Sequence, residues 1–125
     1  MSMLKFTQDH EWLRREADGS ITVGITDYAQ EQLGDIVYVE LPEADAAVAA
    51  GTQVVVIESV KAVGEINMPL AGRIVAVNDR LGDAPELVNS APLGDGWLMR
   101  IEADDAAGLD AFMDEAAYRD YLAGL

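Results

Sequence analysis

Short runs of β-branched residues between turn signals restrict this chain to a β-rich fold. Residues 54–57 (Val-Val-Val-Ile) and 74–77 (Ile-Val-Ala-Val) are two such runs. Pro69 and Gly72 stand between them and are typical of strand ends and turns. Apolar runs of this length, bounded by glycine and proline, are typical of buried strands. We therefore expect a hairpin after residue 57, with the segment 58–65 (Glu-Ser-Val-Lys-Ala-Val-Gly-Glu) at its tip.

The same alternation of strands and turns continues along most of the chain. Asp18-Gly19 is a strong hairpin dipeptide. Thr26 is a suitable N-cap for a short helix that ends at Gly34. Residues 43–51 form an acidic, alanine-rich connection, and residues 82–87 a loop with one helical turn beginning at Pro85. The predicted strands occupy residues 11–14, 20–24, 36–41, 53–59, 65–68, 73–78 and 97–101.

The last part of the chain changes character. Alanine, aspartate and glutamate replace the β-branched residues, and the apolar residues that remain are spaced for one face of short helices. We expect residues 103–125 to be a helical extension packed on the β core, with Asp114 capping the last helix. The extension is too small to bury a core alone, so residues 1–125 are expected to form one domain.

Charge and composition exclude several classes of function. The net charge is −15, which repels nucleic acid and anionic membrane surfaces. The chain has no cysteine and no cluster of histidines, so no thiolate or metal chemistry is indicated. Residues 1–6 lack the basic start and apolar stretch of a signal peptide, and no apolar run is long enough to span a membrane. We expect a cytoplasmic monomer that meets larger partners transiently.

Lys61 is the residue at the hairpin tip with distinctive chemistry. It is one of two lysines in the chain, and its neighbours Val60 and Ala62 carry no charge. A lone amine on a rigid turn is suited to carry a covalent swinging arm, because lysine combines a flexible stem with a nucleophile. Glu58 and Glu65 flank it at positions where a modifying enzyme could recognise the tip.

The run 58–62 and five further segments, in order along the chain, resemble the glycine cleavage system H protein family. The run 58–62 resembles that family's lipoylation motif, and the resemblance covers nearly the whole chain. The other segments are 10–12 (His-Glu-Trp), 23–30 (Val-Gly-Ile-Thr-Asp-Tyr-Ala-Gln) together with 33–42, 86–89 (Glu-Leu-Val-Asn) and 94–97 (Gly-Asp-Gly-Trp). The resemblance implies a mainly β fold, a lipoyl-type β-sandwich or flattened barrel with short helices.

The resemblance also implies a function without catalysis by the chain itself. Lipoate would be amide-linked to Lys61 by a lipoyl ligase or transferase. The arm would accept an aminomethyl group from a glycine decarboxylase, the P component, and deliver it to a tetrahydrofolate-dependent aminomethyltransferase, the T component. Dihydrolipoamide dehydrogenase, the L component, would reoxidise it.

By the same resemblance, two sets of residues surround the arm. Glu11, Glu65 and Asp9 are expected to contact the aminomethyl group, since a carboxylate can hold its amine by a charge-assisted hydrogen bond. The modifying enzyme is expected to recognise Glu58, Val60, Ala62 and Glu65. Two departures are notable: Gly64 stands where relatives often carry serine, which we expect to loosen the turn, and Leu93 replaces a frequent aromatic.

Other functions are compatible with parts of the pattern. A lipoate relay that serves 2-oxoacid dehydrogenases is the main alternative. Lipoyl domains of those enzymes tend to carry aspartate before the lysine, where this chain has Val60, and biotin carriers flank it with methionines. A hydrolase using Glu11 and Glu65 as an acid–base pair, or an unmodified structural β domain, would fit less of the sequence.

Overall fold

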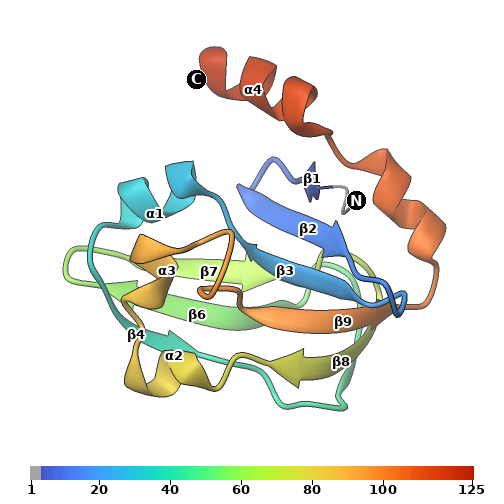
Figure 1. Ribbon diagram of the computed structural model, residues 1–125, viewed down its shortest axis with the longest axis horizontal. Coiled ribbons are helices and arrows are strands. Elements are labelled where there is room, and N and C mark those ends of the chain that lie inside the picture. The colour runs from blue at the N-terminus through green and yellow to red at the C-terminus, as the bar shows by residue number, and fades with distance from the viewer. Residues whose placement is uncertain (1–3) are drawn as a thin grey trace.

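The computed structural model describes residues 4–125 and consists of two antiparallel sheets with short helices at their edges (Figure 1). Met1–Met3, part of the segment assessed for a signal peptide, lie outside the described residues. One sheet has the strand order β1-β2-β3-β9-β8-β5 and the other the order β4-β6-β7. In the described residues the two sheets remain separate and form no closed barrel. Of the two predicted forms, a β-sandwich or a flattened barrel, the sandwich is confirmed.

The strands and helices have the following bounds. The strands are β1 (Leu4–Phe6), β2 (Glu11–Arg15), β3 (Ile21–Ile25), β4 (Ile36–Glu40), β5 (Ala47–Val48), β6 (Gln53–Ser59), β7 (Val63–Asn67), β8 (Gly72–Val77) and β9 (Met99–Ala103). The helices are α1 (Asp27–Leu33), α2 (Arg80–Asp83), α3 (Leu87–Ser90), the 3-10 helix η1 (Ala106–Ala111) and α4 (Glu115–Ala123).

Most of the predicted strands are confirmed, and the misses are short elements. β6 has the predicted bounds. The structure adds β1 and β5, of which β5 lies inside the segment predicted as a connection. The prediction of a loop from residue 82 was wrong at its start, because Gly82 and Asp83 belong to α2. The predicted helical extension begins later than residue 103, because Ala103 still pairs with Gly72 as the last residue of β9.

The core lies between the inner faces of the two sheets. Apolar side chains alternate inward along the strands, and the buried set has less than a tenth of its surface exposed. Members from both sheets are Leu13, Val23, Ile25, Val55, Ile57, Ile74, Met99 and Ile101. Each such side chain stabilises the fold by about 1.5–3 kcal/mol relative to exposure, so the sheets are held face to face by burial.

A second, smaller cluster attaches the C-terminal helix to the opposite side of β2. Phe6 of β1 stacks on Tyr118 of α4 with ring centroids 4.6 Å apart, beside the buried Trp12. Trp12 is directly opposite Gly24 on β3, where a side chain would place its Cβ 2.6 Å from the indole. Glycine at position 24 therefore allows the tryptophan to lie flat on the neighbouring strand.

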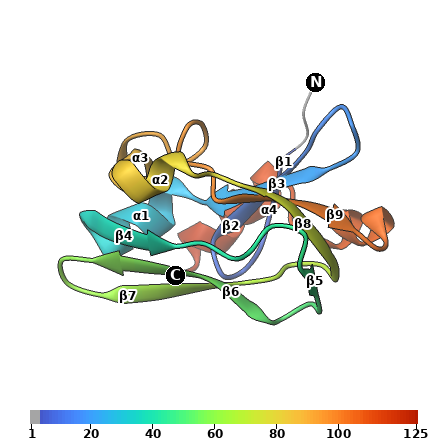
Figure 2. The ribbon, with the colours of Figure 1, turned by 90° about the horizontal axis from the view of Figure 1, so that it is seen from below.

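Two helix caps agree with the sequence. The Thr26 side chain accepts a hydrogen bond from Ala29 N at the start of α1, and Asp114 accepts one from Ala117 N at the start of α4. α1 ends at Gly34, whose φ of 83° favours glycine. The Gly34 cap fixes where α1 stops, so the chain can turn into β4 beside the β6–β7 turn, at one end of the molecule (Figure 2). No described helix has the length and apolar character required to cross a bilayer.

Candidate functional site

The turn between β6 and β7 presents Lys61 to solvent on a fixed backbone. Ser59 organises the turn: its Oγ accepts hydrogen bonds from Lys61 N at 3.3 Å and Ala62 N at 2.9 Å, and donates to the Ala62 carbonyl at 3.1 Å. Ser59 N also donates to that carbonyl at 2.9 Å. The turn is therefore closed by its own serine, and the Lys61 side chain is left exposed.

A neighbouring loop supports the turn from the side. Val60 N donates to the Asp35 carbonyl at 3.0 Å, which ties the tip to the connection between α1 and β4. The stem of Lys61 passes over Gly34, where an added Cβ would be 3.0 Å from the lysine Cε. Within residues 4–125 Lys61 forms no ion pair, and its side chain is exposed. The amine is accordingly accessible to a modifying enzyme.

Asn89 on α3 holds that supporting loop in place. Its Oδ1 accepts a hydrogen bond from Ile36 N at 2.8 Å, and its Nδ2 donates to the Gly34 carbonyl and to Gln30 Oε1, each at 2.9 Å. Gly34 and Ile36 flank Asp35, whose carbonyl receives the bond from Val60, and Gln30 lies on α1 before this loop. Residues 86–89 are one of the segments that carry the family resemblance, but only the structure connects Asn89 to the lysine turn.

Gly64 has a different position from the one expected. It lies within β7, paired with Ile57, and not in the turn. A Cβ there would be 3.1 Å from Leu33 of α1. The expectation that glycine loosens the turn was therefore wrong, because this glycine allows α1 to pack closely against the hairpin.

A cavity of about 460 Å³ lies at the other end of β7. Both polar and apolar residues line it. The lining residues are Phe6, Thr7, Gln8, Asp9, Glu11, Gly51, Asn67, Met68, Pro69, Ala111, Phe112 and Met113. The structure thus brings two of the predicted arm contacts, Asp9 and Glu11, into one cavity. Sequence reasoning missed the other lining residues, since they come from separated segments.

Glu11 is the unusual group in this cavity. Its side chain is buried, with 3% of the residue exposed. One carboxyl oxygen receives a hydrogen bond from Thr7 Oγ1 at 3.3 Å, whereas Oε2 has no partner among the described residues. Burial, together with the charge of Asp9, raises the pKa of Glu11 from 4.5 to about 7. A cation or hydrogen-bond donor that enters the cavity would supply the partner that this carboxyl group lacks among the described residues.

Glu65 lies between the two ends of β7 but does not line the cavity. It alternates with Val63 and Asn67 on the outward face of the strand, and all three side chains are exposed. From Val63 to Asn67 the strand extends by about 13 Å. Glu65 and Glu11 are thus in different environments, one in solvent and one buried, and they do not form the close pair that an acid–base hydrolase requires.

The remaining conspicuous residues serve packing. His10, with a positive φ of 67°, shares a 2.8 Å hydrogen bond between its Nδ1 and the Tyr118 hydroxyl and lies against Tyr28. Burial lowers the pKa of His10. Trp12 is fully buried and Trp97 partly buried. In the part of the chain that the structure describes, no group of acids and histidines has the arrangement of a metal site.

Comparisons with known proteins agree with this arrangement. A family model described as glycine cleavage H-protein matches residues 4–124. The chain is 55% identical over 119 residues to the glycine cleavage system H protein of Citrobacter koseri, covering 95% of this chain and 92% of that protein. The corresponding protein of Klebsiella pneumoniae is 56% identical over the same length and coverage. A solved structure of a glycine cleavage system H protein from Mycobacterium marinum superposes with a TM-score of 0.86 at 35% identity, covering 98% and 97% of the two chains.

We expect Asn89→Ala to loosen the lysine turn. The change removes three hydrogen bonds and leaves the amide of the buried Ile36 unpaired, at a cost of about 1–3 kcal/mol in unfolding free energy. Hydrogen exchange at the Val60 amide, measured by NMR, should speed up. Asn78→Ala is the matched control, because Asn78 also bridges backbone carbonyls, those of Asp95 and Trp97. Unchanged Val60 exchange in Asn89→Ala, or an equal change in Asn78→Ala, would contradict this role.

Glu11→Gln should remove a pH dependence of stability. Because the pKa of Glu11 is raised in the folded state, the folded protein holds a proton that the unfolded chain releases between pH 4.5 and about 7. Wild-type stability from this group is present below pH 4.5 and is lost as the pH rises to about 7. The variant's stability relative to wild type should therefore increase by up to about 3 kcal/mol from pH 4.5 to pH 8. Urea titrations across this range measure it, and a pH-independent difference would refute the raised pKa.

Proposed function

Because the chain belongs to the glycine cleavage H-protein family, we propose that it is the lipoyl-carrying shuttle of a glycine cleavage system, with lipoate attached to Lys61. The carrier itself performs no catalysis and works in the cytoplasm with the enzymes of that system. The observation that carries the proposal is Lys61: an exposed amine without an ion partner among the described residues, on a turn fixed by Ser59 and Asp35.

The residues present fit a lipoyl group in two respects. Lys61 offers a free amine at an exposed tip, as amide formation requires. The cavity at the far end of β7 is lined by Glu11, whose buried Oε2 has no hydrogen-bond partner among residues 4–125. When bound, a lipoyl group supplies a disulfide that accepts and releases cargo. Tethering at Lys61 raises its effective concentration at any docked enzyme, and the lack of cysteine prevents exchange with the chain's own thiols.

The cavity is suited to protect a cationic cargo from water. The cargo implied for this family is an aminomethyl group, which is charged at neutral pH. Glu11 would hold it by a charge-assisted hydrogen bond through Oε2, with Asp9 adding negative charge at the cavity wall. The apolar wall, including Met68 and Phe112, would exclude water from the bond. Glu65 would contact the arm along β7, between the turn and the cavity.

Recognition by the lipoylating enzyme is assigned to the surroundings of the tip. Glu58, Val60, Ala62 and Glu65 are all exposed within four residues of Lys61. An enzyme that forms the amide must enclose the lysine nitrogen itself, so these residues lie within its reach. We assign them to this recognition step.

Lys61→Arg should abolish both modification and carrier function while keeping the charge and the fold. Arginine stays protonated and is not acylated. After expression with lipoate, wild type should gain the mass of one lipoyl group on the peptide that contains Lys61, and Lys61→Arg should gain none. Lys5→Arg is the control and should be modified like wild type. Lipoylation at Lys5, or full glycine cleavage activity of Lys61→Arg in a reconstituted system, would reject the proposal.

Glu11→Gln should shorten the lifetime of the loaded arm. Glutamine removes the negative charge that faces the cationic cargo but preserves the side-chain shape, so the cargo should be released to water faster, by about tenfold for a lost charge-assisted bond of about 1.5 kcal/mol. Release of ammonia from the isolated loaded protein measures this rate. Asp83→Asn, an exposed acid on α2, none of whose residues lines the cavity, is the control. An unchanged rate in Glu11→Gln would remove Glu11 from the site.

A further inference from the structure

Exposed apolar side chains gather around the lysine turn. Most of the large apolar residues exposed in residues 4–125 lie there, and the exceptions are Leu93 and Leu125. Their exposed fractions are 53% for Val37, 51% for Tyr38, 68% for Val60 and 63% for Val63. Solvent-exposed apolar groups that cluster in one place, and are not scattered singly, mark an interaction surface.

These side chains form one continuous surface. Tyr38, Glu58 and Val63 lie directly opposite one another on β4, β6 and β7. A β-bulge between Ile36 and Tyr38 leaves Val37 exposed as well. We name this surface the tip face, and it surrounds Lys61. Its residues are Asp35, Val37, Tyr38, Glu58, Val60 and Val63.

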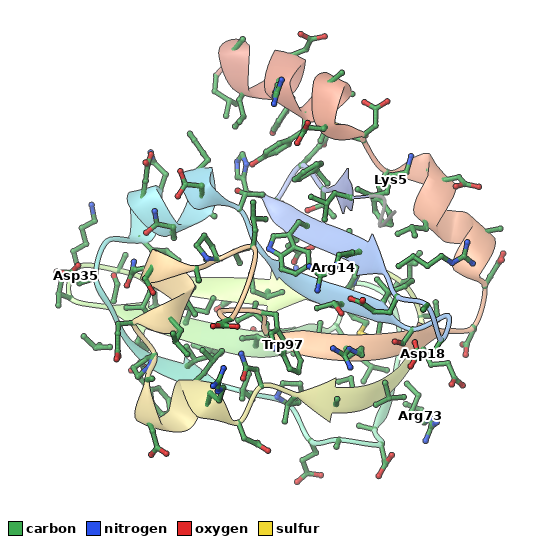
Figure 3. The ribbon with its side chains drawn as sticks, viewed as in Figure 1. Lys5, Arg14, Asp18, Asp35, Arg73 and Trp97 are labelled. Atoms are coloured by element: carbon green, nitrogen blue, oxygen red, sulfur yellow. The ribbon has the colours of Figure 1, made fainter. Side chains whose placement is uncertain are left out.

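Lys61 is the one lysine or arginine in the stretch of sequence that forms the tip face, and Arg80, on α2 beside β4, is ion-paired with Asp95 at 3.9 Å. No lysine or arginine other than Lys61 occurs between Arg15 and Arg73, a stretch that includes all of α1, β4, β6 and β7. Figure 3 shows Asp35 at one end of the molecule and Arg73 at the opposite end. The exposed acids Asp35 and Glu58 belong to the tip face, with Glu65 next to it on β7. Conversion of the Lys61 amine to an amide therefore leaves the tip face with negative charge alone.

We propose that the tip face docks the partner enzyme that loads the arm, through a partner surface that is apolar at its centre and rimmed by arginine and lysine, and that acylation of Lys61 strengthens this docking by removing the one cation. An apolar centre with a polar rim is the usual anatomy of a protein interface. Like charges that face each other weaken binding, and opposite charges steer it. Unmodified carrier keeps the charge of Lys61. It therefore binds this partner more weakly than modified carrier does, apart from any contact that the arm itself makes. This inference presupposes the carrier role.

The charge effect has a limited size and a definite salt dependence. A unit charge about 7 Å from a partner's cation contributes roughly 0.6 kcal/mol in water, a factor of about three in affinity. The Debye length is about 10 Å at 0.1 M salt and about 3 Å at 1 M. The preference for a neutral residue 61 should therefore be about threefold at low salt and disappear near 1 M.

Direct binding of variants without an arm tests the inference. The affinity of the glycine decarboxylase component for Lys61→Gln and for Lys61→Arg is measured by calorimetry at 0.05 M and 1 M salt. Lys61→Gln should bind about threefold more tightly at low salt and equally at high salt. Equal affinities at low salt, or tighter binding of Lys61→Arg, would overturn the role of charge.

Changes on the tip face test the docking surface itself. In the Lys61→Gln background, Tyr38→Ser should weaken binding about tenfold, whereas Leu125→Ser, which changes an even more exposed apolar residue outside the tip face, should not. Glu58→Gln should weaken binding about threefold, and Asp110→Asn should not, although both remove one negative charge. Asp110 lies on η1, at the end opposite the β6–β7 turn (Figure 1). Equal effects of tip-face and control variants would overturn the surface assignment.

A replacement variant and a comparison separate failure of the docking inference from misfolding and from failure of the carrier role. Val63→Thr preserves a β-branched side chain and replaces Tyr38→Ser if the latter does not fold by circular dichroism. Failure of the carrier role is seen in the mass of wild type and in turnover, neither of which enters the binding measurement. A lipoylated, active wild type whose armless variants bind no decarboxylase component would therefore overturn the docking inference alone.

Discussion

The hydrogen bond from Val60 N to the Asp35 carbonyl connects the two parts of the molecule on which a carrier depends. On one side of it is a hairpin turn closed by Ser59, and on the other a loop fixed by Asn89. Without that bond the turn would be held by Ser59 and by the pairing of β6 with β4 and β7, and the Val60 amide would lose its partner. With it, the backbone of residue 61 is fixed and the flexibility of the site is confined to the lysine side chain. A tethered arm gains effective concentration only if its anchor has a defined position.

Lys61 and Glu11 lie near opposite ends of β7, and the two ionisable groups have different environments. The amine at one end is in water, where its charge costs little, and the carboxyl at the other end is buried with one oxygen unpaired among the described residues. Burial of such a group lowers stability unless it is protonated or meets a cation. The fold tolerates this cost next to a cavity large enough for a small cationic group. Local conflicts of this kind are expected at functional sites.

The charged residues are unevenly distributed over the structure. The net charge of −15 alone indicates solubility and basic partners. The structure adds that the sheet β4-β6-β7 and α1 contain no lysine or arginine, and that the one such residue in the turn between β6 and β7 is the residue proposed for acylation. Exposed Tyr38 and Val63 lie beside it. The proposed acylation of Lys61 would therefore change the net charge of the surface around it.

The sequence by itself determined the strands with long β-branched runs, the caps at Thr26 and Asp114, and Lys61 as the residue of interest, because these depend on local propensity and on one residue's chemistry. It did not indicate β1 or β5, since strands of three and two residues are defined by their partners and not by their own composition. Only the tertiary structure decided that Thr7, Glu11, Asn67 and Phe112 line one cavity, that Glu65 lies outside it, and that Asn89 supports the lysine turn. Burial and hydrogen bonding between segments tens of residues apart set those relations, and no local pattern records them.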